Sequence, residues 1–111
     1  MSKNTLQVLI NGKQVGYASN LEIDMPSVRL RFQPTSSFAE FALLFESLDK
    51  AYDERRYEDV DQLSNRVDGL KISVRDERNR LVFSSDSSSN PVQRIAAVRF
   101  RGNELIWRPA S

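Results

Sequence analysis

The chain has 111 residues, of which 40% are hydrophobic and 28% charged, and its formal net charge is +1. This balance is typical of one soluble globular domain, and it disfavours a dedicated nucleic-acid-binding protein. Histidine and cysteine are both absent, which excludes Ser-His and Cys-His nucleophiles, ordinary zinc sites, haem and iron–sulfur ligation, and disulfides.

No apolar run in the sequence is long enough to span a bilayer, and its first residues lack the apolar core of a signal peptide. We therefore expect a cytoplasmic protein without a membrane partner. Residues 1–111 are expected to form a single domain, because the length of the chain matches the usual size of one folding unit.

Alternating apolar residues at the start of the chain predict a β-hairpin whose turn is Asn11-Gly12. Both residues of an Asn-Gly pair tolerate the positive φ that a type I′ turn requires, so the dipeptide is a strong hairpin signal. A two-residue turn places Val8 opposite Val15 and Leu6 opposite Tyr17, with all four side chains on one face of the sheet.

A second hairpin is predicted over residues 21–32, with its turn at Pro26-Ser27. A tight turn there places Ile23 across from Leu30 on the inner face. On the outer face, oppositely charged residues pair across the strands, which favours this register; the pairs are Asp24 with Arg29 and Glu22 with Arg31.

Two consecutive helices are predicted next, at about 37–53 and 57–68. Ser37 and Glu40 have the spacing of a capping box, and Gly69 follows the second helix as a helix-ending residue. The apolar positions of the first helix recur at helical spacing and predict a buried stripe, made of Phe38, Phe41, Ala42, Phe45, Leu48 and Tyr52.

Strand patterns return after the helices, at 70–74 and 81–83, and a final hairpin turns at Gly102-Asn103. The serine-rich segment 84–90 between them is predicted to be a flexible loop. Strands, then helices, then strands are typical of an α+β fold. We expect a mostly antiparallel, bent sheet of about six or seven strands, with both helices packed on one face.

Neither a cofactor nor a metal site is predicted. The four glycines are too scattered for a phosphate-binding loop, and Gly16 lies within a strand, where glycine marks a bulge or a close approach. Asp59-Val60-Asp61 lacks the glycine and the later acid of a calcium loop.

The segment 40–61 carries eight acids and three bases, so it has a charge of −5 and the remainder of the chain +6. The acids fall on the polar faces of the predicted helices. The simplest interpretation is that these faces are solvated surface, and the more specific one is that they bind a partner. The residues predicted to contact a partner protein are Glu46, Asp49, Asp53, Glu58 and Asp61, with Tyr57 and Trp107 as aromatic anchors.

The chain has twelve arginines and four lysines. If the strands that carry them are neighbours, the outer face of the sheet has an arginine stripe that can bind anions. Alternatively, these guanidinium groups pair with acids of adjacent strands and cover the sheet. The stripe consists of Arg29, Arg31, Arg99 and Arg101.

These features predict a non-catalytic protein-binding module that masks or inhibits a partner, as bacterial immunity proteins, antitoxins and phage-encoded inhibitors do. One alternative is a structural subunit of an assembly such as a virion or secretion apparatus, formed by pairing of strand edges. A second alternative is nucleic-acid binding through the arginine stripe. A hydrolase that uses carboxylates alone is the least favoured interpretation.

Overall fold

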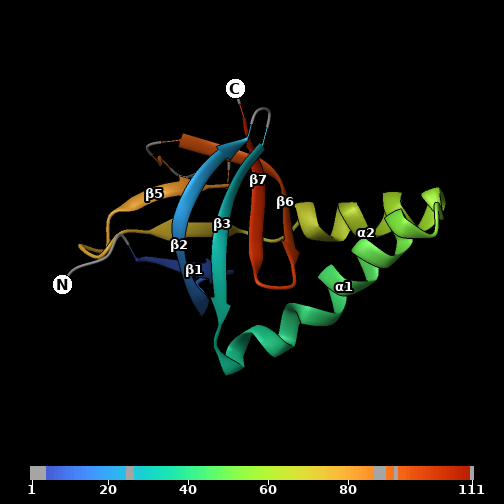
Figure 1. Cartoon of the computed structure of the whole chain (residues 1–111), viewed down its shortest axis with the longest axis horizontal. Helices are drawn as coiled ribbons and strands as arrows, with labels where there is room; N and C mark the ends of the chain where they lie inside the picture. Colours follow the sequence, from blue (N-terminus) through green and yellow to red (C-terminus); the bar gives the residue numbers. More distant parts are fainter. Residues whose placement is uncertain (1–4, 25–26, 87–89, 92, 111) are drawn as a thin grey trace.

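The computed structural model describes residues 5–24, 27–86, 90, 91 and 93–110. They form a single α+β domain in which the strands make one closed barrel, in the order β1-β2-β3-β7-β6-β5-β4 (Figure 1). No helix in these ranges is long and apolar enough to cross a membrane. The elements are β1 (Leu6–Ile10), β2 (Lys13–Asp24), β3 (Ser27–Pro34), a 3₁₀ turn (Ser36–Phe38), α1 (Ala39–Asp53), α2 (Tyr57–Asp68), β4 (Ile72–Arg75), β5 (Leu81–Ser84), β6 (Gln93–Arg101) and β7 (Glu104–Pro109).

The predicted bent, mostly antiparallel sheet is confirmed, and the structure adds that it closes on itself. β4 pairs with β1, and β7 pairs with β3. These contacts join strands that precede the two helices in the chain to strands that follow them. The described strands pair antiparallel except β5 and β6, which run parallel. Closure leaves few free strand edges on the barrel.

The first hairpin has the predicted turn but a different register. Asn11 and Gly12 have φ of 53° and 83°, and Ile10 pairs with Lys13. A bulge between Val8 and Leu9 then shifts the pairing by one residue. Because neighbouring residues of a strand point to opposite faces, Tyr17 lies on the outer surface with 42% of its area exposed. The prediction that Tyr17 shares a face of the sheet with Val8 and Val15 is wrong.

Gly16 directly follows the bulge and pairs with Val8. A Cβ atom at Gly16 would lie 2.5 Å from the carbonyl oxygen of Gln33 and 2.6 Å from the ring of Phe32. The expectation of a close approach at this glycine is confirmed, because β3 crosses over the space that a side chain would need.

The second hairpin turns one residue earlier than predicted. Asp24 pairs with Ser27, so Ile23 lies opposite Val28 rather than Leu30. Ile23 projects to the same face as its buried partner Val28, but it lies near the tip of the hairpin and is 67% exposed. Its predicted pairing with Leu30 is wrong, and it lies outside the core. The charged pairs change in the same way, and Glu22 faces Arg29.

The two helices have nearly the predicted bounds, but the capping box at Ser37 is not formed. The chain enters α1 through the 3₁₀ turn, which leaves Phe38 at the N-cap without a side-chain cap. The ring of Phe38 instead packs 5.1 Å from that of Phe32 and 5.0 Å from that of Phe100. Gly69 ends α2 as predicted.

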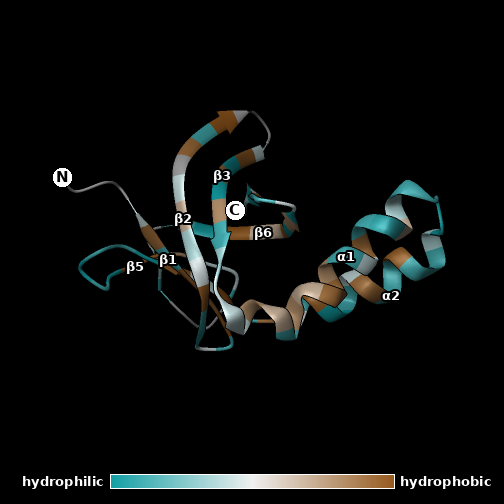
Figure 2. Ribbon diagram, turned by 60° about the horizontal axis from the view of Figure 1, so that its bottom comes forward, coloured by the Kyte–Doolittle hydropathy of each residue, from teal (hydrophilic) through white to brown (hydrophobic). Residues whose placement is uncertain are grey.

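The first half of α1 packs against the barrel, and the second half continues past it together with α2 (Figures 1 and 2). Phe45 joins the two parts, since its ring lies 4.6 Å from Phe100. The apolar sides of both helices face each other and the barrel in Figure 2. The helices therefore pack on one side of the barrel and form a projecting hairpin, which we call the helical hairpin (residues 39–68).

The segment predicted as a flexible loop begins inside the barrel. Ser84 is the last residue of β5 and is buried. The Ser85 hydroxyl accepts a hydrogen bond from the Ile72 amide at 3.0 Å and donates one to the Leu70 carbonyl at 3.3 Å. These two serines anchor β5 to β4, which contradicts the prediction for them, and residues 87–89 lie outside the described residues.

Candidate protein-interaction surfaces

The end of the helical hairpin farthest from the barrel is a short turn held by Arg56. Arg55 adopts a φ of 56° there, and Arg56 forms ion pairs with Glu54 at 2.8 Å and with Asp59 at 2.5 Å. Tyr57 follows this turn and is 64% exposed. The predicted aromatic anchor Tyr57 is thus available to a partner at the tip of the molecule.

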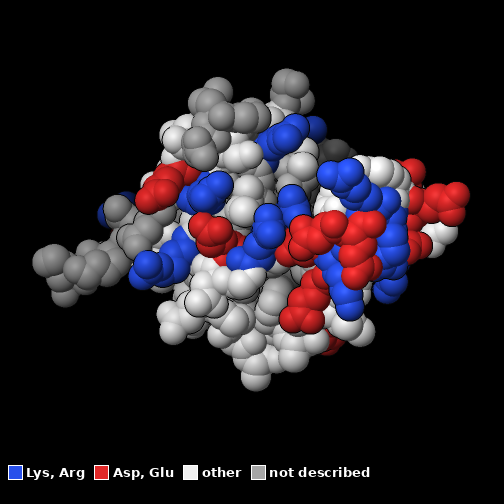
Figure 3. All heavy atoms as spheres, turned by 45° about the vertical axis from the view of Figure 1, so that its right-hand side comes forward, with Lys and Arg blue, Asp and Glu red and all other residues white. Residues whose placement is uncertain are grey.

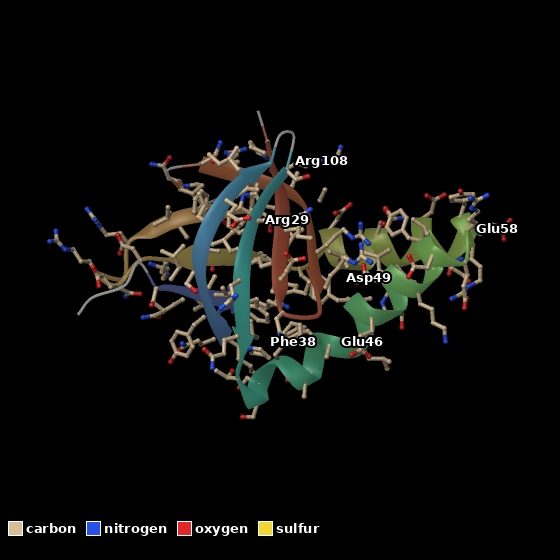
Figure 4. The ribbon with its side chains drawn as sticks, in the orientation of Figure 1. Arg29, Phe38, Glu46, Asp49, Glu58 and Arg108 are labelled. Atoms are coloured by element: carbon tan, nitrogen blue, oxygen red, sulfur yellow. The ribbon has the colours of Figure 1, made fainter. Side chains whose placement is uncertain are left out.

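Four of the five predicted acidic contact residues lie on the surface of the helical hairpin. Within the described part of the chain they form no ion pair. Glu58 lies near the tip, and Glu46 lies along α1 (Figure 4). The four residues are Glu46, Asp53, Glu58 and Asp61, all exposed.

The fifth acid, Asp49, faces the barrel and is only 20% exposed at its side chain. Its Oδ1 atom lies 2.5 Å from Nη2 of Arg99, and its Oδ2 atom lies 3.7 Å from Nε of Arg101. Arg99 also stacks over the ring of Tyr52 at 4.8 Å. Asp49 therefore joins the helical hairpin to β6, and this contact leaves it poorly placed for a partner.

The structure brings all four predicted stripe arginines onto the outer face of three neighbouring strands. β7 lies between β3 and β6. Residue Ile106 of β7 pairs with Arg29 on one side and Arg99 on the other. Glu104 pairs in the same way with Arg31 and Arg101. Adjacent strands are about 4.8 Å apart, so the arginines form two short rows across the sheet.

Acids compensate much of the charge of this stripe. Arg29 lies 3.8 Å from Glu104, and the single carboxylate of Asp49 is shared by two arginines of β6, Arg99 and Arg101. Arg31 is exposed and forms no ion pair within the described ranges. On the face turned toward the helical hairpin, basic and acidic groups alternate rather than forming a field of one sign (Figure 3). The paired interpretation of the arginines fits this geometry better than an open anion site.

Trp107, the second predicted aromatic anchor, lies inside the barrel with 0% of its area exposed. Its ring packs 4.8 Å from that of Phe83. Residues alternate between the faces of a strand, and Trp107 falls on the inner face of β7 together with Leu105. The prediction that Trp107 contacts a partner is therefore wrong.

A hollow of about 670 Å³ crosses the outer faces of β2 and β3. Arg29 and Arg31 line it together with Tyr17, Glu22 and Glu104. The sequence pattern already predicts Glu22 on the outer face beside an arginine. It does not predict Tyr17 there, because the bulge in β2 that turns Tyr17 outward has no local sequence signal. The hollow is polar, and bases and acids balance in it.

One described carboxylate has a perturbed pKa, and its role is structural. The backbone amide of Arg80 donates to Asp76 at 2.9 Å, and with the Arg80 side chain and the Arg78 amide it lowers the pKa of Asp76 below 3.8. These bonds close the turn between β4 and β5. Among the described residues, no three metal-ligating side chains come together.

Comparison with known proteins adds no relative to this description: no family model, curated protein or solved structure matches the chain. A fold class alone does not assign a function, because the same architecture carries many unrelated activities. The function must therefore be argued from the surfaces described above.

Proposed function

We propose that this protein is a non-catalytic binding module that masks or inhibits a partner protein, and that the helical hairpin is the surface it presents. The observation that carries the proposal is the placement of Glu46, Asp53, Glu58 and Asp61 on a projecting element, with exposed Tyr57 at its end. These groups have no partner of opposite charge among the described residues.

Charge complementarity indicates the kind of partner. Uncompensated carboxylates on a projecting surface attract a basic patch and raise the rate of encounter with it. Tyrosine is among the residues that contribute most binding energy when an interface closes over them. A basic cleft of a partner protein, covered by the helical hairpin with Tyr57 buried in it, is the interaction that these features favour.

The two other functions receive less support from this geometry. Assembly through strand edges needs free edges, and closure of the barrel pairs β4 with β1. Nucleic-acid binding needs uncompensated positive charge, whereas acids lie beside Arg29, Arg99 and Arg101. We therefore place both below protein binding.

The proposal can be tested by capturing partners from an extract of the source organism and measuring binding with purified components over a salt series. Replacing Glu58→Lys and Asp61→Lys together should weaken binding at least tenfold at low salt and flatten its salt dependence, because complementary charge is lost. Inhibition of the partner's own activity should decline in parallel.

A matched control carries the same change of net charge on the barrel, through Glu22→Lys and Glu104→Lys, both exposed. This control should bind almost as the natural protein does. If the two double variants lose affinity equally, only overall charge matters. If neither loses affinity, the helical hairpin is not the binding surface.

A further inference from the structure

Two adjoining hollows lie where the end of α2 meets β6. One, of about 300 Å³, is bounded by Leu48 and Tyr52 of α1 as well as by α2 and β6. The other, of about 290 Å³, continues toward Ile72 of β4. Both are lined by Val67 and Asp68 of α2 and by residues 96–98 of β6, so they adjoin, and we call the two together the recess.

A bulge in β6 holds this recess open. The pairing with β7 is interrupted between Ala96 and Arg99, and Ala97 has a φ of 54°, which is unusual for a residue with a side chain. Both alanines are exposed. Their small side chains leave space beside Val67 that a larger residue would fill.

The polar groups of the recess favour a cation. Asp68 is exposed, and no ion pair with another described residue occupies its carboxylate. It is the last residue of α2, so the negative end of the helix dipole adds to its charge. The one guanidinium in the lining, that of Arg99, is already bound to Asp49.

The apolar part of the lining indicates which kind of cation fits the recess. Leu48, Val67 and the two alanines offer contacts to a hydrocarbon chain, and the ring of Tyr52 lies at the same opening. A lysine or arginine side chain combines an alkyl stem with a charged head, and such side chains bury the stem while the head stays near water.

We infer that this recess receives the alkyl cation of a lysine or arginine side chain from the partner protein. The inference rests on the proposed function and extends it: the acidic helical hairpin attracts a basic surface, and the recess at its base holds one anchoring side chain. Deeply seated anchors of this kind commonly dominate the energy of an interface.

The recess can be tested without a partner, by titrating the full chain with n-butylammonium and n-butylguanidinium and following backbone amides by NMR. We expect shifts concentrated at residues 67–70 and 96–99. n-Butanol, which has the same stem without the charge, should bind roughly fivefold more weakly, the difference that one partly screened ionic contact makes.

Asp68→Asn should reduce cation affinity by about the same factor, and Ala96→Leu should abolish the shifts by filling the recess. Asp61→Asn is the matched control, since it removes one exposed carboxylate from the same helix. The spectra themselves show that each variant is folded.

Equal binding of n-butanol and the cations would overturn the inference, as would an equal loss in Asp61→Asn and Asp68→Asn. Shifts spread over the whole surface would do so too. The proposed function is tested separately by the Glu58→Lys and Asp61→Lys pair, so a cation-binding recess without a protein partner would be recognised. With the partner in hand, unchanged affinity in Ala96→Leu would exclude the recess as an anchor site.

Discussion

The barrel and the helical hairpin are built from the same kinds of residue but use them differently. In the barrel, apolar side chains from strands far apart in sequence point into one core, and Val8, Val15 and Val74 have no exposed area. In the helical hairpin, a narrow apolar seam joins two helices, while Tyr57 and Leu43 stay in water. The difference indicates that the stabilising apolar contacts lie inside the barrel and where the helices pack on it and on each other, while the outer surface of the helical hairpin stays exposed.

The largest expected effect is at Phe45, where the two regions meet. Phe45→Ala removes a buried ring that packs on Phe100, and the cavity should lower the free energy of unfolding by about 3–5 kcal/mol. Leu43 lies two residues earlier on the same helix and is 73% exposed, so Leu43→Ala should change it by less than about 0.5 kcal/mol. Denaturant unfolding measures both.

If Phe45→Ala and Leu43→Ala lower the free energy of unfolding by similar amounts, the contrast between buried and exposed surfaces of α1 is wrong. The whole surface of α1 would then contribute to stability, and not only its contact with the barrel.

A smaller effect on stability is expected from replacing a glycine by alanine, at Gly16 in the barrel and at Gly69 directly after the helical hairpin. Gly16→Ala forces a Cβ against the backbone of β3, and such overpacking costs about 1–3 kcal/mol. At Gly69, which ends α2 with a φ of −76°, a Cβ would meet nothing nearer than 3.5 Å. Gly69→Ala should therefore be neutral or stabilise by about 0.4–1 kcal/mol.

Thermal unfolding of the two alanine variants checks this contrast. A tolerated alanine at residue 16 would show that the crossing of β2 and β3 is looser than the close approach at Gly16 requires.

The smallest effect concerns pH and the turn between β4 and β5. The pKa of Asp76 is lower in the folded chain than its ordinary value of 3.8. Its contribution to stability is therefore present above about pH 3.8 and is lost as the pH falls through the lower folded pKa. Asp76→Asn should remove this part of the acid dependence, so the stability of the variant and that of the natural protein should converge at low pH.

Arg80→Met serves as the control, because it keeps the backbone amide of residue 80, the largest cause of the lowered pKa, and removes the guanidinium. Most of the acid dependence should survive in it. Denaturant midpoints measured between pH 2 and 6 test this. If the guanidinium were the main cause of the lowered pKa, Arg80→Met would lose as much of the acid dependence of stability as Asp76→Asn does.

Local signals in the sequence were sufficient for the elements and several turns. The helical spacing of apolar residues gave the bounds of both helices to within about two residues, and Asn11-Gly12 and Gly102-Asn103 lie at the turns of their hairpins. These features depend on residues within one turn of each other, so neighbouring side chains and backbone preferences fix them.

Strand register and the candidate surfaces depended on tertiary contacts. A bulge in β2 turned Tyr17 outward, and a second irregularity in β2 and the earlier turn left Ile23 near the exposed tip of its hairpin; no local pattern signals where an extra residue enters a ladder. Trp107 is buried because β3 and β6 flank β7 in the closed barrel and its inner face is covered, which its own hairpin alone does not determine. Likewise, Asp49 was grouped with the exposed acids, although the packing of α1 on β6 brings it to Arg99.

The sequence by itself therefore determined the α+β order, the two helices, the sharp turns and the close approach at Gly16, since each rests on short-range sterics and periodicity. The tertiary structure decided that the sheet closes into a barrel and that Asp49 neutralises part of the arginine stripe. It also decided that a recess opens between α2 and β6. Each of these joins residues distant in the chain, and their meeting depends on how all the strands and helices pack together.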